Sequence, residues 1–305
     1  MKAFTAQPAS GDRYTLGECC RWDAVTNRLS WVDVFTGRLL TASWDGARLT
    51  DVATVTVPAH LTAFAPHRDR DQGWVIAANQ GIALLDHDGT LTWLAEPEAG
   101  GAGRIRMNDG ACDPAGRFWA GSMAYDETPG AGALYRYDGE RRYTRILDQV
   151  TISNGLAWSL DSTRMYYADT AAQTISVLDY DNATGNVAGR RTLATVDRRH
   201  GGPDGMCIDL EGCLWVAIWG AGEVRRYTPA GEQVAVVTLD AAQPSCPALG
   251  GESGHTLFMT TAREGMAEQL LAAQPDAGRV FATQVDVPGP AVQAWDPAAA
   301  SPAPL

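Results

Sequence analysis

The chain has 305 residues, of which 45% are hydrophobic and 20% charged, as is typical of a soluble globular protein with a large core. Its formal net charge of −12 at pH 7 argues against nucleic acid or an anionic membrane as a partner. The sequence contains no apolar run of the ~18 residues that would indicate a transmembrane helix.

The N-terminal residues and the spacing of the cysteines also agree with a soluble globular protein. Residues 1–8 lack the continuous apolar segment of a signal peptide. The six cysteines form no Cys-x-x-Cys pair, so we expect reduced thiols rather than a metal or disulfide framework. The sequence therefore predicts a cytoplasmic protein that is a monomer or a weak homo-oligomer and acts on a small molecule.

The predicted elements are short strands whose pattern returns along the chain. Alternating runs such as 174–179 and 223–228 are separated by Gly- and Asp-containing turns such as 86–89 and 181–185. A bulky strand residue follows a turn at intervals of 44, 44, 47, 49 and 43 residues, at Trp31, Val75, Trp119, Tyr166, Trp215 and Phe258. A repeat of ~40–50 residues with about four strands indicates a propeller blade. We therefore predict an all-β fold, a six-bladed β-propeller with a central channel.

The ends of the chain carry further expectations. Residues 1–295 should form a single domain, in which residues 3–9 pair with the region 279–295 to close the ring. Residues 262–277 have helical composition and are expected to form one or two helical turns. The Ala/Pro-rich segment 296–305 is expected to be a disordered tail.

A polar residue opens each predicted blade, four positions before a common reference residue of the repeat. The six are Glu18, His60, Asn108, Asn154, Asp204 and Ser245. In a propeller, the loop that enters the innermost strand lies at one mouth of the channel, so these side chains should form a ring around its axis. Such a ring is unfavourable unless its members are solvated, bonded to one another or bound to a ligand.

Three members of the ring carry the strongest oxygen donors: Glu18, Asn154 and Asp204. Two carboxylates and one amide oxygen, completed by water, suit Ca²⁺, Mg²⁺ or Mn²⁺, and Zn²⁺ is also compatible. The alternative is that each residue only bonds backbone amides near a wet channel, which is the commoner situation for any one of them. Because they recur in register, we expect one divalent metal ion.

Four segments also carry recognisable motifs, in an order that covers nearly the whole chain. They are Gly17-Glu18, Arg106–Phe118, Ser153–Trp158 and Pro203–Met206. With these motifs the chain resembles the gluconolactonase / senescence-marker-protein (regucalcin-like) family. The resemblance implies a six-bladed propeller with one divalent metal ion in its channel and the hydrolysis of sugar lactones.

The resemblance further implies roles for individual residues. Glu18, Asn154 and Asp204 would be the protein ligands of the metal ion, and Asp204 would also be the general base. Arg106 and Asn108 would hold the hydroxyls or the carbonyl of the substrate.

Two further residues are candidates for substrate binding. Asp126 falls near an acidic position that the family has at the channel mouth, although the surrounding segment matches only loosely. The family pattern does not fix a role for His60, and a lone histidine is more often a substrate contact or a hydrogen-bonded filler than a metal ligand. The chain departs from the family at Cys19-Cys20, where Gly-Pro is common; the two cysteines are more often small buried hydrophobes than groups near a metal.

Lactone hydrolysis requires a polarised carbonyl and a delivered water, which a metal ion and a neighbouring carboxylate can provide. Arg106 can donate to ring hydroxyls or to the developing oxyanion. The sequence contains no Gly-x-Ser-x-Gly elbow, P-loop or dinucleotide fingerprint. The leading hypothesis is hydrolysis of an aldonolactone to an aldonic acid. The alternatives are a metal-dependent hydrolase of a non-sugar lactone or ester, and a non-enzymatic Ca²⁺-binding protein.

Overall fold

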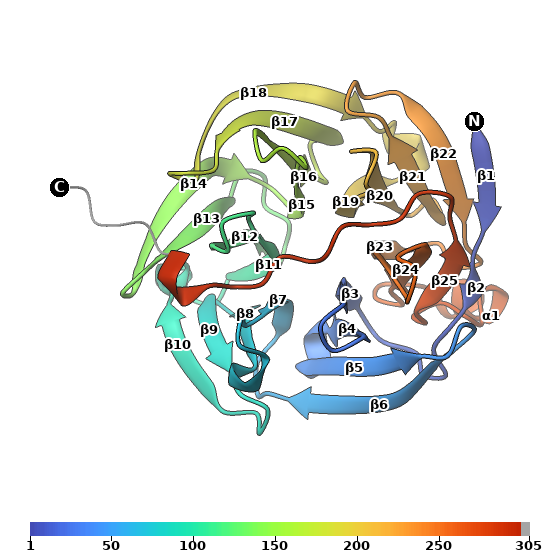
Figure 1. Ribbon diagram of the computed structural model, residues 1–305, viewed down its shortest axis with the longest axis horizontal. Helices are drawn as coiled ribbons and strands as arrows, with labels where there is room; N and C mark the ends of the chain where they lie inside the picture. The colour runs from blue at the N-terminus through green and yellow to red at the C-terminus, as the bar shows by residue number, and fades with distance from the viewer. Residues whose placement is uncertain (300–305) are drawn as a thin grey trace.

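The computed structural model describes residues 1–299. Six sheets surround a central channel, and the predicted six-bladed β-propeller is confirmed (Figure 1). In each blade the strand that begins the repeat lies innermost, and the following strands pair antiparallel toward the outside.

The first three blades each consist of four consecutive strands. They are β3 (Gly17–Asp23), β4 (Arg28–Asp33), β5 (Arg38–Trp44) and β6 (Leu49–Thr56); β7 (Leu61–Pro66), β8 (Trp74–Ala78), β9 (Gly81–Leu85) and β10 (Leu91–Ala95); and β11 (Ile105–Cys112), β12 (Phe118–Ala124), β13 (Gly132–Gly139) and β14 (Arg142–Val150). The other three contain β15 (Ser153–Trp158), β16 (Arg164–Asp169), β17 (Thr174–Asp181) and β18 (Asn186–Thr195); β19 (Gly202–Ile208), β20 (Leu214–Trp219), β21 (Glu223–Tyr227) and β22 (Gln233–Thr238); and β23 (Pro244–Gly250), β24 (Thr256–Thr261) and β25 (Phe281–Gln284).

Helical segments are short. Within the stretch 262–277, only α1 (Glu268–Ala273) is an α-helix, which agrees with the one or two turns expected there. The 3₁₀ turns are η1 (Val34–Thr36), η2 (Arg70–Gln72), η3 (Ala99–Gly101), η4 (Arg198–His200) and η5 (Pro297–Ala299). Among the described residues, no helix is long and apolar enough to cross a membrane.

The N-terminus closes the ring in two places. β2 (Gln7–Pro8) pairs with β25, with Gln7 opposite Ala282, and so supplies the outer strand of the sixth blade. This part of the predicted closure is confirmed. The prediction is wrong for β1 (Lys2–Thr5), which runs parallel to β22 of the fifth blade. The side chain of Phe4 packs edge-on against Trp215 there, at 6.2 Å between ring centroids, and this apolar contact favours the fifth blade.

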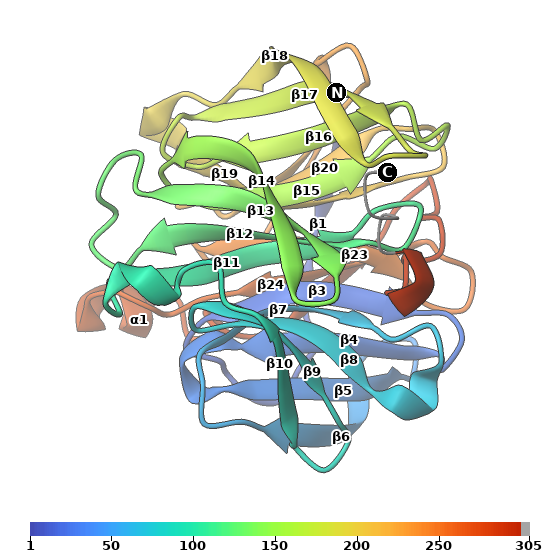
Figure 2. The same cartoon turned by 90° about the vertical axis from the view of Figure 1, so that its left-hand side faces the viewer.

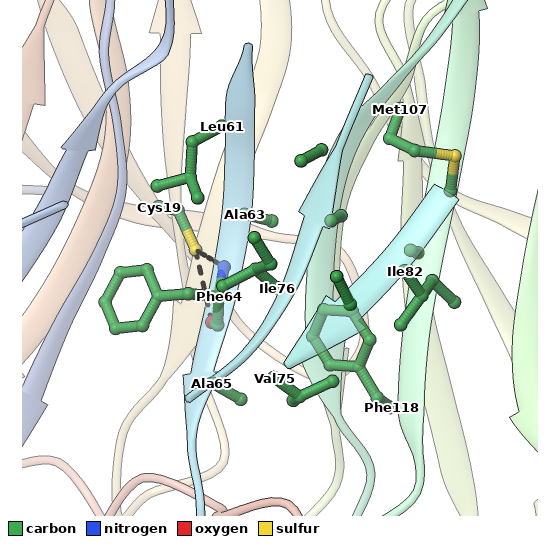
Figure 3. Close-up of a cluster of buried hydrophobic side chains, with 14 of the residues drawn as sticks. Cys19, Leu61, Ala63, Phe64, Ala65, Val75, Ile76, Ile82, Met107 and Phe118 are labelled. Carbon is green, nitrogen blue, oxygen red and sulfur yellow. Dashed lines mark hydrogen bonds between the residues drawn. The ribbon is translucent and has the colours of Figure 1, made fainter. Parts of the chain in front are cut away.

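The core lies between the blades. The six landmark residues at the repeat spacing all fall on the second strand of a blade and are at most 1% exposed. Burying one such side chain contributes roughly 1.5–3 kcal/mol. Between the first three blades, Phe64, Val75 and Phe118 pack in one cluster, in which Cys19 contacts the backbone of Phe64 (Figure 3).

Two of these landmarks are also held by buried aspartates. The Asp113 carboxylate accepts hydrogen bonds from Trp119 Nε1 (2.9 Å) and Arg117 Nε (2.7 Å). Two blades later, the Asp209 carboxylate accepts a hydrogen bond from Trp215 Nε1 (3.0 Å). In each of these two blades, an aspartate six residues before the tryptophan therefore fixes the turn between the first and second strands to the core of the blade.

The C-terminal segment 285–296 crosses the channel mouth from the sixth blade to the boundary of the second and third (Figure 1). Pro288 O accepts from Leu210 N (2.9 Å), Trp295 N donates to Pro66 O (2.8 Å), and Asp296 N donates to Gly116 O (2.9 Å). This segment and α1 lie on opposite faces of the propeller (Figure 2). The expected disorder is therefore wrong for 296–299, which are held by these contacts and form η5, while 300–305 lie outside the described residues.

Candidate active site

The innermost strand of each blade has an irregularity at or next to the polar position that opens the repeat. The register shifts between Glu18 and Arg21 in β3, and between Asn154 and Leu156 in β15; the same irregularity occurs in every other inner strand. A β-bulge leaves a residue unpaired and re-aims its side chain. The repeated bulge is the local structural reason why the polar residues recur in register.

Blades four and five approach each other closely at this level. Gly155 has φ +30°, and a Cβ added there would lie 2.5 Å from the carbonyl oxygen of Asp204. A larger residue would push the two strands apart. The glycine after Asn154 thus brings Asn154 and Asp204 together.

The channel mouth on the α1 side holds a cavity of about 470 Å³. Five of the predicted site residues line it: Glu18, Arg106, Asn108, Asn154 and Asp204. Of the six equivalent polar positions, His60 and Ser245 do not line it. The Ser245 hydroxyl instead donates to Gly17 O at 2.5 Å.

A hydrogen-bond chain orients the amide of Asn154. Its Nδ2 donates to Thr170 Oγ1 (2.8 Å), and the Thr170 hydroxyl donates to Pro203 O (2.7 Å), one residue before Asp204. Its Oδ1 accepts from Asn108 Nδ2 (3.0 Å). The amide oxygen is therefore turned toward the cavity rather than toward the blade.

The half-buried Glu18 and the buried Asp204 form no ion pair within residues 1–299, although the nearby Arg106 acts to lower the pKa of both carboxyls. Burial raises the pKa of each well above its ordinary value; Asp204 and Asp109 add to the rise at Glu18, and Asp109 to that at Asp204. Asp204 Oδ1 has no hydrogen-bond partner among the described residues. An orphaned carboxylate oxygen near a second carboxyl and an oriented amide oxygen fits a divalent cation. No group of three or more His, Cys, Asp or Glu side chains in residues 1–299 has metal-binding geometry, which is consistent with a set of only two carboxylates plus an amide.

Arg106 is held rigidly at the side of this set. Its Nη1 donates to Asn108 Oδ1 (2.5 Å) and to Met107 O (3.0 Å). The guanidinium carbon lies 6.0 Å from the ring centroid of Phe35 and 5.8 Å from that of Tyr125. Because Nε and Nη2 make no hydrogen bond within the described residues, they remain available to a ligand.

The structure directs Asp126 away from the cavity. Its Oδ1 accepts from the backbone N (3.1 Å) and the hydroxyl (2.7 Å) of Thr128, which fixes it in an exposed turn. The neighbouring Glu127, whose φ is +55°, lines the cavity instead. His60 does not line the cavity either; its Nδ1 is 2.7 Å from the hydroxyl of Tyr125, one of the rings that hold Arg106.

Several further residues that line the cavity were not predicted from the sequence. They are Glu127, Thr170, Gln173, Arg198, Trp219 and Glu264. Most lie in loops outside the repeat register, so no periodic signal marks them. The Arg198 guanidinium donates to Ala171 O (3.0 Å) and pairs with no carboxylate among residues 1–299, whereas its neighbour Arg199 pairs with Asp197 (2.6 Å).

Fold and site together define a six-bladed propeller protein with an oxygen-donor pocket at one mouth of its channel. The chain belongs to the SMP-30/Gluconolactonase/LRE-like family, whose model matches residues 16–263. This confirms the family resemblance that the motifs indicated.

Relatives and solved structures match over almost the whole chain. Regucalcin of Gallus gallus is 35% identical over 92% of this chain and 94% of its own. The 6-deoxy-6-sulfogluconolactonase of Pseudomonas putida is 37% identical over 95% of this chain and 96% of its own. The structure of a calcium-binding protein, regucalcin, from Agrobacterium tumefaciens superposes with a TM-score of 0.89 at 28% identity, covering 97% of this chain and 99% of that one.

Proposed function

We propose that this protein hydrolyses sugar lactones to aldonic acids, using one divalent metal ion bound by Glu18, Asn154 and Asp204. The observation that carries the proposal is the unpartnered Oδ1 of Asp204, which shares a cavity with Glu18 and the oriented amide of Asn154. The names of the relatives, a sulfogluconolactonase and a calcium-binding regucalcin, support both halves of it.

The proposed ligand set contains only oxygen donors. When bound, a divalent ion supplies Lewis acidity for the lactone carbonyl and lowers the pKa of a bound water. Ca²⁺, Mg²⁺ and Mn²⁺ suit such a set best, and Zn²⁺ remains compatible. Thr170 and Asn108 keep the amide oxygen of Asn154 directed at the ion.

Asp204 is the proposed general base. Its unpartnered oxygen can accept a proton from the water whose oxygen attacks the lactone carbonyl carbon. As the ring C–O bond breaks, the same proton can pass to the departing ring oxygen, which becomes a hydroxyl. Proton transfer of this kind contributes about 10²–10⁴-fold to the rate.

Arg106 and Asn108 are the proposed substrate-holding groups. Arg106 uses Nη1 for Asn108 and Met107, and its remaining donors can bind a sugar hydroxyl or the carbonyl oxygen. Packing against two aromatic rings restricts the guanidinium, so little conformational entropy is lost when the substrate binds.

One cation in the lining of the cavity, Arg198, further favours lactones that carry an anionic substituent. Burial lowers the pKa of Arg106, and the carboxylates of Glu264 and Glu127 act in the opposite direction by attracting its charge. Arg198, in the loop between blades four and five, has no such partner. A sulfonate, phosphate or carboxylate on the substrate could pair with it, which agrees with the name of the relative from Pseudomonas putida.

The test is hydrolysis of a lactone panel by purified protein before and after chelation. We expect hydrolysis that is lost with chelator and restored by one of the four divalent ions, with anionic sugar lactones having the highest kcat/KM. Highest kcat/KM on a non-sugar lactone or ester would favour the alternative hydrolase. No turnover of any substrate, together with tight Ca²⁺ binding, would favour the non-enzymatic alternative suggested by the regucalcin relatives.

A further inference from the structure

Arg21 is a half-buried cation in the half of the channel away from the active-site mouth. It lies on β3, where Nε donates to Phe64 O (3.0 Å) and Nη2 donates to Gly110 O (2.5 Å). Both acceptors are neutral carbonyls, and Arg21 forms no ion pair within residues 1–299. A guanidinium has five N–H donors, so three of them are left for a ligand or water.

Several other buried or half-buried guanidiniums among residues 1–299 are paired with a carboxylate. Arg117 binds Asp113, Arg136 binds Asp138, Arg70 binds Asp23 and Arg226 binds Asp209, all at 2.6–2.7 Å between nitrogen and oxygen. Burying a cation without an anion is unfavourable, because neutral carbonyls replace only part of its hydration. Within residues 1–299, Arg21 shares the lack of a carboxylate partner with Arg106, which lines the lactone cavity, and with Arg28.

Among residues 1–299, no carboxylate or thiolate bonds Arg21 directly. Burial raises the pKa of the Cys112 and Cys246 thiols well above their ordinary value, although Arg21 acts to lower both, so the thiols are neutral at pH 7. The Cys19 thiol approaches Phe64 O at 3.5 Å, as a protonated donor does (Figure 3). The Asp109 carboxylate accepts from Gly110 N (2.7 Å) and forms no ion pair with Arg21 within residues 1–299; burial raises the pKa of Asp109, and the attraction of Arg21 acts to lower it.

A cavity of about 330 Å³ between the first and second blades joins this guanidinium. Arg21, Arg28 and Arg70 line it, against the single carboxylate of Asp23. Both oxygens of Asp23 are already bound by Arg70, at 2.7 and 3.0 Å. On a chain of net charge −12, this excess of arginine is a local reversal of sign.

The remaining walls of the cavity are largely apolar, with Leu39, Val55 and Trp74 among them. An inorganic anion would leave these walls uncovered, whereas an anion with an apolar body would fill them. We propose that this cavity binds a small organic carboxylate, with its carboxylate group on Arg21 and its apolar body against Trp74. This second site is separate from the lactone cavity and does not depend on the activity proposed for it.

Benzoate is a suitable probe, and benzamide, its neutral isostere, is the matched ligand control. Binding would be measured by calorimetry and by thermal unfolding of the full chain loaded with its divalent ion. We expect benzoate to bind and raise the Tm, with sulfate weaker and benzamide without effect. Arg21→Met, which keeps the apolar stem, should weaken benzoate binding by about ten- to hundredfold. Arg48→Met, at an exposed arginine of the same blade, should leave it unchanged.

Two further measurements keep the proposal testable if Arg21→Met does not fold. Ala53 is exposed and lines the cavity, so Ala53→Trp should obstruct benzoate binding without touching Arg21. Benzoate bound at the lactone site would instead inhibit hydrolysis competitively and bind Ala53→Trp normally. That result, or equal binding of benzoate and benzamide, or no binding at all, would overturn the proposal.

Discussion

Thr170 connects Asn154 to the strand that carries Asp204, although it lies outside the repeat register of polar residues. Thr170→Val preserves the shape of the side chain but removes the hydroxyl that accepts from Asn154 Nδ2 (2.8 Å) and donates to Pro203 O (2.7 Å). Two hydrogen bonds of net ~0.5–1.5 kcal/mol each predict a loss of about 1–3 kcal/mol in the free energy of unfolding. The freed amide of Asn154 should lower affinity for the divalent ion by about 10–100-fold, as expected when the partner of a ligand is removed.

Ion binding would be followed by calorimetric titration after chelation, and stability by urea denaturation. The control is Thr184→Val, which removes a hydroxyl bonded to Asp181 (2.7 Å) in the same blade but far from the cavity. The control should leave ion affinity unchanged. If Thr170→Val loses stability while binding the ion like the wild type, then the hydrogen-bond chain does not orient a ligand and the proposed role of Asn154 is wrong.

Four other perturbations test separate parts of the structure. Asp204→Asn should lower kcat by about 10²–10⁴-fold in initial-rate assays while ion titration still shows binding; unchanged kcat would exclude it as the base. Arg198→Gln should lower kcat/KM for an anionic sugar lactone by about tenfold or more and change that of neutral glucono-lactone little; equal losses on both would contradict charge recognition. Trp295→Ala should lower the free energy of unfolding by about 3–5 kcal/mol without changing kcat, because the buried Trp295 lies at the opposite mouth from the cavity. Burial acts to raise the pKa of Asp23, but its bonds to Arg70 outweigh this and lower it below the ordinary 3.8; the pair therefore stabilises the fold above pH ~4, and Arg70→Gln should destabilise at pH 7 but progressively less as the pH falls below that value.

The propeller could be predicted because its core is periodic. One bulky residue per blade occupies the same buried position on the second strand, so Trp31 and Phe258 carry the same signal although they are far apart in the chain. The parallel pairing of β1 with β22 could not be predicted in this way. It depends on the contact of Phe4 with Trp215, between segments without any repeat relation.

The polar ring could be predicted only as a set of positions. All six inner strands carry the bulge, but the partner of each side chain decides whether it faces the cavity. The Ser245 hydroxyl is hydrogen-bonded to Gly17 O and to the hydroxyl of Thr260, and the His60 ring is hydrogen-bonded to the hydroxyl of Tyr125. Gly17 and Tyr125 belong to other blades than the residues they contact, so a single repeat does not contain both partners.

The local sequence around Asp126 indicates a turn that was not predicted. An aspartate two residues before a threonine commonly closes a turn on the backbone of that threonine. The structure has this turn, with Asp126 Oδ1 bonded to both the backbone N and the hydroxyl of Thr128. The acidic side chain at the cavity is consequently the next residue, Glu127, in a left-handed conformation.

In the loop between blades four and five, Arg198 lines the cavity, whereas the neighbouring Arg199 does not. The carboxylate of Asp197 accepts from the backbone N of Arg199 (2.9 Å) and pairs with its guanidinium (2.6 Å), which holds that cation outside the cavity. Arg198 lies on the cavity side, and its guanidinium has only the carbonyl of Ala171 as a partner among residues 1–299. If the proposed preference for anionic lactones is correct, then it depends on Asp197, a residue that does not line the cavity. Asp197→Asn should weaken the hold on Arg199 and admit a second cation to the rim, which would increase rather than decrease the preference for an anionic substrate.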